Sequence, residues 1–71
     1  MASDFYKKLG GRIRELRQKQ MFSREKLSEL ADMNTYYLGE IERGEKKPSL
    51  DFLIKICNVL KIKLHELLNL K

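Results

Sequence analysis

Between Ser23 and Gly44 the chain reads S-R-E-K-L-S-E-L-A-D-M-N-T-Y-Y-L-G-E-I-E-R-G. Apolar residues recur at helical spacing in two short runs there, first Leu27, Leu30 and Ala31 and then Leu38 and Ile41. The residues between the runs, 32–34, break this period, and Asp32 tolerates the left-handed backbone conformation that a tight turn requires. The pattern predicts helices over 24–31 and 35–42 that form a helix-turn-helix unit over about 23–42.

Capping residues mark the ends of both predicted helices. Ser23 is a good N-cap for the first helix, and Glu25 follows at its positive end. Asn34 can cap the second helix, and Gly44 fits its stop. These residue types therefore support the two boundaries independently of the apolar spacing.

The remainder of the chain also reads as helix. One apolar stripe precedes the unit, another follows Pro48 and the N-cap Ser49, and a third closes the chain; their members are Phe5, Leu9, Ile13 and Leu16, then Leu50, Leu53, Ile54, Cys57 and Leu60, then Leu64, Leu67 and Leu68. No stretch alternates as a strand would. The sequence therefore predicts an all-α, five-helix domain over residues 1–71.

Composition restricts the partners and the compartment. The 71 residues suffice for one domain, and the net charge of +5 suits nucleic acid, an anionic membrane or an acidic protein. A lone cysteine excludes an internal disulfide, and neither a membrane-length apolar run nor a signal peptide is visible. We therefore expect a soluble, cytoplasmic protein.

The segment 35–42 has the pattern of a DNA-reading helix. Leu38 and Ile41 would anchor its inner face, and the outer face would carry Thr35, Tyr36, Gly39 and Glu40. Basic residues flank it in sequence, as expected where phosphates line both walls of a groove; they are Arg24, Arg43, Lys46 and Lys47. Lys7 and Lys8 are interpreted as a solvated face.

The same segment resembles a known family. The runs 23–31 and 37–44, followed by Lys47-Pro48-Ser49-Leu50, are similar to the Cro and phage-repressor type of helix-turn-helix, also called the Xre family. The Ile-Glu-Arg-Gly and Pro-Ser-Leu runs carry most of this resemblance, which spans about residues 9–68. It implies a lambda-repressor-like fold and binding to double-stranded DNA.

The resemblance also implies residue roles. Base contacts would come from the start and outer face of the second helix, and backbone contacts from the residues around it; the first set is Asn34, Thr35, Tyr36, Gly39 and Glu40, and the second is Ser23, Arg24, Tyr37, Arg43, Lys46 and Lys47. Arg17 and Glu42 occupy the positions of a buried ion pair. Arg24 departs from the usual Gln and Asp32 from the usual Gly. Glu40 could accept from a cytosine amino group or serve only to reject wrong sites.

Other functions find little support in the residues. Cys57 lies on an apolar stripe, which indicates a buried thiol, and His65 has no partner at metal-ligand spacing. Without a Ser/His/Asp set, a phosphate-binding glycine loop or a metal cluster, we expect no enzyme, cofactor, metal or small-molecule ligand. An antitoxin or another protein-interaction module on the same fold is the alternative. A membrane-surface role would need the apolar stripe of the first helix, which the core requires.

The C-terminal residues predict self-association. Five apolar residues fall close together near the end, more than one short helix can bury, and they are Ile62, Leu64, Leu67, Leu68 and Leu70. We therefore expect a homodimer formed through about 61–71, acting on a near-palindromic operator. The expected function is transcriptional regulation of the restriction–modification controller or phage-repressor type.

Overall fold

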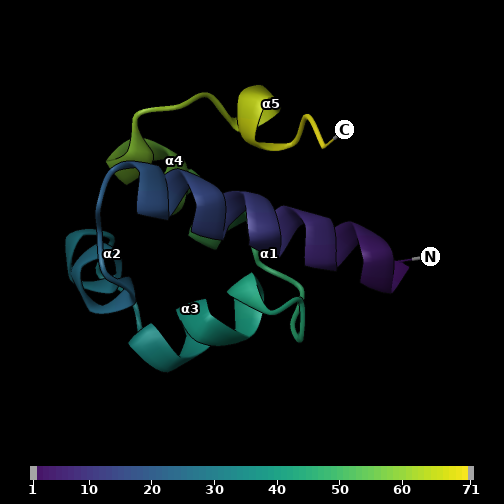
Figure 1. Cartoon of the computed structure of the whole chain (residues 1–71), viewed down its shortest axis with the longest axis horizontal. Helices are drawn as coiled ribbons and strands as arrows, with labels where there is room; N and C mark the ends of the chain where they lie inside the picture. The colour runs from purple at the N-terminus through teal and green to yellow at the C-terminus, as the bar shows by residue number, and fades with distance from the viewer. Residues whose placement is uncertain (1, 71) are drawn as a thin grey trace.

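The computed structural model describes residues 2–70, which form five helices. They are α1 (Ala2–Lys19), α2 (Arg24–Leu30), α3 (Thr35–Glu42), α4 (Leu50–Leu60) and α5 (Leu64–Leu67) (Figure 1). Over these described residues there is no strand, so the all-α prediction is confirmed. The predicted bounds of α2 and α3 hold to within one residue.

The predicted caps are formed by hydrogen bonds. The side-chain oxygen of Ser23 accepts from the Lys26 N–H at 2.9 Å, and that of Ser49 accepts from the Phe52 N–H at 3.0 Å. Asp32 adopts the expected left-handed conformation, with φ 53°, between α2 and α3. Local sequence therefore sets where these helices begin.

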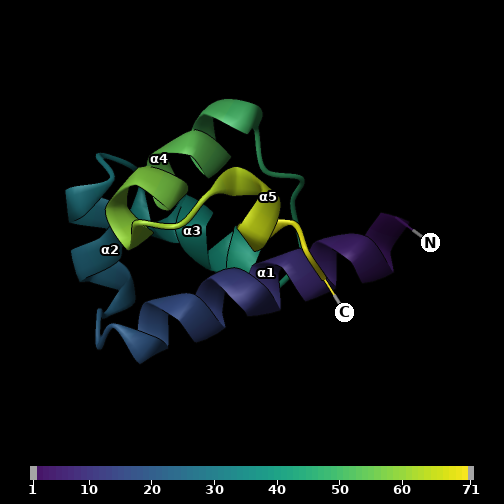
Figure 2. The same cartoon turned by 90° about the horizontal axis from the view of Figure 1, so that it is seen from above.

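The helices pack around α1. In Figure 1, α1 crosses the molecule with α3 on one side and α5 on the other, and α2 lies at its C-terminal end. Figure 2 shows α4 and α5 together on the same side of α1. Fully buried side chains from all five helices meet between them; among them are Leu9, Ile13, Leu27, Leu38, Ile41, Ile56 and Leu67. This core fixes the inner face of α3 and leaves its outer face free.

The predicted apolar stripe of α4 was partly wrong. Leu50 and Ile54 are exposed, whereas Phe52 and Ile56 are buried. With 3.6 residues per turn, Leu53, Ile56, Cys57 and Leu60 form the inward stripe, and Leu50 and Ile54 lie one turn apart at its edge. The apolar pattern therefore places Leu50 and Ile54 in the core, although both side chains are exposed at the surface.

The C-terminal residues also divide differently from expectation. Leu67 is 0% exposed within its own core, so its expected place in a dimer interface is wrong. Ile62, Leu64 and Leu70 are half-buried against the core, and Leu68 is 38% exposed. The single turn of α5 gives its inward position to Leu67, and this leaves Leu68 pointing outward.

A glycine lets α1 approach the end of α3 closely. A methyl group placed on Gly10 would overlap the carbonyl oxygen of Ile41 and lie 2.7 Å from that of Glu42. Next to it, Gly11 has no neighbouring atom within 4 Å of such a methyl group. The contact between the two backbones therefore depends on the missing side chain of Gly10.

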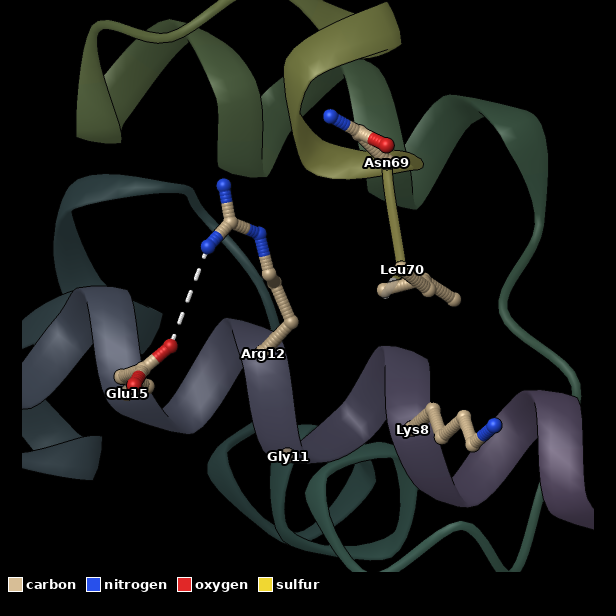
Figure 3. A pocket seen from close by; sticks show the side chains of 6 residues that line it. All are labelled: Lys8, Gly11, Arg12, Glu15, Asn69 and Leu70. Atoms are coloured by element: carbon tan, nitrogen blue, oxygen red, sulfur yellow. Dashed lines mark ion pairs between the residues drawn. The ribbon is translucent and has the colours of Figure 1, made fainter.

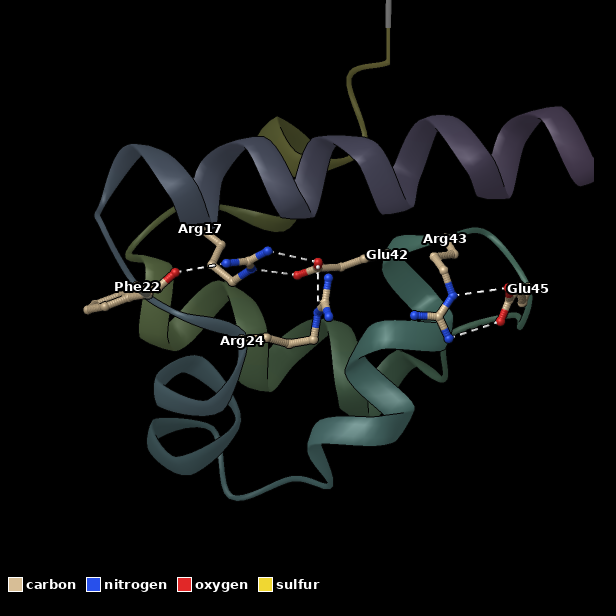
Figure 4. Close-up of polar contacts among 6 residues, drawn as sticks. All are labelled: Arg17, Phe22, Arg24, Glu42, Arg43 and Glu45. Atoms are coloured by element: carbon tan, nitrogen blue, oxygen red, sulfur yellow. Dashed lines mark hydrogen bonds and ion pairs between the residues drawn. The ribbon is translucent and has the colours of Figure 1, made fainter.

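The predicted ion pair between Arg17 and Glu42 is present and buried. Arg17 Nε donates to Glu42 Oε2 at 2.7 Å, and Nη2 donates to Oε1 at 3.0 Å (Figure 4). The third nitrogen, Nη1, donates to the Phe22 carbonyl at 2.9 Å. Arg24 Nε adds a contact of 3.3 Å to Oε1. Glu42 thereby connects the end of α3 to α1 and α2, and its side chain is only 1% exposed.

The two adjacent glycines allow a matched test of the α1–α3 contact. We expect Gly10→Ala to lower the free energy of unfolding by about 1–3 kcal/mol, because the methyl group meets backbone that can yield only by moving a helix. Gly11→Ala should instead stabilise by up to about 1 kcal/mol through its helix propensity. Urea unfolding of both variants measures this difference, and equal effects would contradict the close approach.

The buried ion pair gives a second prediction. Glu42→Gln should lower the free energy of unfolding by about 3–5 kcal/mol, because the buried Arg17 charge loses its anion. The double variant Arg17→Met/Glu42→Leu should recover most of this loss, since an apolar pair leaves no stranded charge. Urea unfolding at low temperature checks both. If the changes in the free energy of unfolding at the two positions simply add, the two side chains do not stabilise each other.

Candidate nucleic-acid interface

The outer face of α3 carries the residues expected to face DNA. Tyr36 is 74% exposed and Thr35 is half-buried, while Leu38 and Ile41 anchor the opposite face in the core. Asn34 lies directly before them, and its Oδ1 accepts from the Tyr36 N–H at 2.7 Å and the Tyr37 N–H at 3.2 Å. The Asn34 oxygen is thus committed to the cap, which leaves its amide nitrogen for a base.

Gly39 lies on the side of α3 that carries Arg43, but it is not open to a base as the sequence predicted. It is buried, and a methyl group placed on it would lie 3.1 Å from Nη1 of Arg43 and 3.6 Å from Cδ of Arg24. Two arginines from the flanks of α3 therefore cover this position. Gly39 provides the room for their side chains rather than a surface for a base.

Two carboxylates pair with the cations after α3. Arg43 Nε donates to Glu45 Oε2 at 3.0 Å and Nη2 donates to Oε1 at 3.2 Å (Figure 4). The hydrogen bonds to Glu45 raise the pKa of Arg43, and in turn they lower the pKa of Glu45. Lys46 Nζ lies 3.6 Å from Glu40 Oε1. These charges are therefore oriented before any partner arrives.

The N-terminal half of α1 also reaches this loop, which sequence reasoning missed. Lys47 Nζ lies 5.9 Å from the ring centroid of Tyr6, and a methyl group on Gly44 would lie 2.6 Å from Cγ of Lys7. The sequence predicts Lys7 to be part of a solvated face. It shares a surface with the 45–48 loop only because α1 packs on α3, and no local signal in the sequence reports that packing.

Tyr37 and Ser23 are both tied into the fold. The ring of Tyr37 packs edge-on against Phe52, with centroids 5.3 Å apart and an interplanar angle of 87°. The Ser23 oxygen accepts from the backbone of α2, as described above. Their hydroxyl protons remain for a phosphate contact, which is the role expected for each of them.

The rest of the described chain offers little for other chemistry. Cys57 is buried, and this burial raises the pKa of its thiol, while His65 is exposed. Residues 2–70 bring together no group of three His, Cys, Asp or Glu that could hold a metal. None of their helices combines the length and apolar character needed to cross a bilayer.

A cleft of about 530 Å³ lies beside α1, away from α3 (Figure 3). Lys8, Arg12 and Glu15 of α1 line one side of it, and Asn69 and Leu70 line the other. Arg12 crosses it to donate to the Glu66 carbonyl at 3.3 Å, so this arginine ties α5 to α1. The cleft is therefore separate from the basic surface around α3.

Comparison with known proteins agrees with this geometry. The chain is 39% identical over 64 residues to the HTH-type transcriptional regulator SinR of Bacillus licheniformis. The aligned region covers 89% of this chain and 58% of that protein. It is 38% identical to the restriction-modification controller protein C.AhdI from Aeromonas hydrophila, whose crystal structure superposes with a TM-score of 0.84 over 90% of this chain and 96% of that one.

A second similar structure is that of SinR, the master regulator for biofilm formation, in complex with DNA. It is 37% identical, with a TM-score of 0.82, and the match covers 86% of this chain and 98% of that one. The curated SinR sequence is longer, and the chain spans little more than half of its length. The helix-turn-helix family itself matches residues 13–67, from α1 to the end of α5, and the chain belongs to this family.

Proposed function

We propose that this chain is a transcriptional regulator, not an enzyme, that binds double-stranded DNA in a sequence-specific manner. The observation that carries the proposal is α3, whose inner face is held in the core while its outer face stays free between basic residues. An α-helix fits the major groove, and cations at both of its flanks meet the phosphates on the two walls.

Within this proposal, side chains divide by position. Thr35, Tyr36 and Glu40 face the base edges, with the amide of Asn34 just before them. Backbone contacts come from residues around α3, namely Ser23, Arg24, Tyr37, Lys46 and Lys47. Arg24 still has its Nη groups for a phosphate, because its contact with Glu42 uses Nε.

The relatives support a regulator over the alternative of a protein-interaction module. SinR is named a transcriptional regulator and C.AhdI a controller protein, and one SinR structure contains DNA. Within the controller and repressor class, we propose the restriction–modification controller type, to which C.AhdI belongs. Such a protein would act in the cytoplasm, where its operator is.

We propose further that two copies bind one operator. Leu50 and Ile54 of α4 and Leu68 after α5 are exposed, and α4 packs against α5. We place these exposed apolar side chains in the dimer interface, together with the half-buried Ile62, Leu64 and Leu70. Two-fold symmetry would place two α3 helices roughly 34 Å apart, one turn of DNA, on a near-palindromic site.

A binding experiment separates base contacts from phosphate contacts. We expect Tyr36→Ala to change the preference at one or two positions of a site selected from random duplex DNA, by about 1–3 kcal/mol. Lys47→Ala should leave preference unchanged but lower affinity for all sequences, and it should reduce the salt slope by about one unit. Titrations at several salt concentrations measure both effects.

Lys8→Ala is the matched control for the loss of a positive charge, because Lys8 lines the cleft on the other side of α1 (Figure 3). Its salt slope should equal that of the unchanged protein. If Tyr36→Ala keeps every base preference, or if Lys8→Ala and Lys47→Ala behave alike, α3 and its loop are not the DNA-binding surface.

Self-association is tested at the exposed apolar residues. We expect the chain to sediment as a dimer at micromolar concentration and Leu68→Asp to sediment as a monomer with weaker operator binding, because a charge would be buried in the interface. Met21→Asp is the control, since Met21 is exposed in the turn after α1, is not among the proposed interface residues, and should leave the dimer intact. A monomeric parent protein with full operator affinity would rule the interface out.

A further inference from the structure

Arg43 is held in one orientation by the end of α3. Gly44, with φ 75°, donates its N–H to the Ile41 carbonyl at 3.0 Å, and the Glu45 N–H donates to the Glu40 carbonyl at 2.9 Å. These two bonds form a Schellman motif, which fixes the backbone of the first two residues after the helix. The Glu45 carboxylate then turns back and accepts both side-chain bonds from Arg43, the C-cap residue.

The pair leaves one complete edge of the guanidinium free. Arginine has five N–H donors, and Glu45 uses the edge formed by Nε and Nη2 (Figure 4). The remaining edge carries one N–H on Nη1 and one on Nη2, side by side. Such a fork matches the O6 and N7 acceptors of guanine in the major groove.

This free edge lies on the base-facing side of α3. Residues 36, 39, 40 and 43 share one face of the helix, because side chains three, four and seven positions apart align. Nη1 of Arg43 lies over Gly39 on that face, 3.1 Å from where a methyl group would stand. The arginine side chain thus lies along the outer face of α3 that begins with Tyr36.

We propose that Arg43 reads a guanine in the operator and that Glu45 is the positioning residue that holds its guanidinium for this contact. The inference rests on the proposed function, and it replaces the backbone role that the sequence predicted for Arg43. An exposed ion pair contributes little to stability, but orienting the fork beforehand reduces the ordering cost of binding. The hydrogen bonds from Arg43 lower the pKa of Glu45, which is the direction that favours the charged carboxylate.

The decisive variant is Arg43→Lys, which keeps the charge and removes the fork. In site selection from random duplex DNA, the unchanged protein should prefer guanine at one position of each half-site. Arg43→Lys should reduce that preference for guanine about tenfold, and it should retain the preferences at the other positions of the site. Its salt slope and its affinity for random duplex should stay unchanged, because a lysine still satisfies the electrostatics.

Glu45→Gln tests the positioning role. It should weaken the same guanine preference by about two- to fivefold, without lowering affinity for random duplex, since a negative charge is removed. The effect should vanish in an Arg43→Lys background, where no fork remains to be held. Glu15→Gln is the matched control: Glu15 is also an exposed carboxylate paired with an arginine, at 3.8 Å from Arg12, but it lies beside the cleft away from α3 (Figure 3).

Several outcomes would overturn the inference. If Arg43→Lys keeps every preference, or Arg43→Ala lowers affinity equally for all sequences together with the salt slope, Arg43 contacts phosphate. If Glu45→Gln acts equally in both backgrounds, Glu45 works only through its charge. Failure of the unchanged protein to select any sequence would instead reject the proposed function, so the two failures are distinguishable.

Discussion

The carboxylate of Glu42 is the point on which the arrangement of α1, α2 and α3 depends. It accepts two hydrogen bonds from Arg17 of α1 and a longer one from Arg24 of α2, and it is almost completely buried. A buried anion is costly unless its partners are fixed, so any shift of α3 relative to the other two helices loses more than one contact. Gly10 reinforces the same junction, because α1 rests directly on the carbonyls that end α3.

Buried residues that hold the fold lie directly beside more exposed residues along the last turn of α3. Ile41 and Glu42 are buried, whereas Arg43 is exposed and Glu40 is half-buried beside Lys46. The position of each more exposed side chain is therefore set by its immediate neighbour in the chain. This explains how a helix of two turns can present side chains to a groove with little freedom, although it has few residues with which to anchor itself.

Sequence alone predicted the elements well because their signals are local. The caps Ser23, Asn34 and Ser49 and the left-handed Asp32 specify boundaries through bonds that span two or three residues. The errors lie where packing decides. Whether Leu67 or Leu68 turns inward depends on the angle at which α5 meets α1, and the covering of Gly39 depends on two arginines from opposite flanks of α3. The ion pair of Arg17 and Glu42 was predicted only because a family resemblance supplied the alignment.

Charges around α3 act at two ranges. The excess of cations, +5 for the whole chain, creates a field that attracts DNA from a distance whatever its sequence. Close to the helix, however, the arginines and Lys46 meet carboxylates, so their charge is partly neutralised and their geometry is fixed. Lys47 instead lies over the ring of Tyr6, where its charge meets an uncharged aromatic face rather than a carboxylate. Such a surface can weaken non-specific attraction of DNA and still keep oriented N–H donors. Fixed hydrogen-bond geometry carries sequence information, whereas net charge does not.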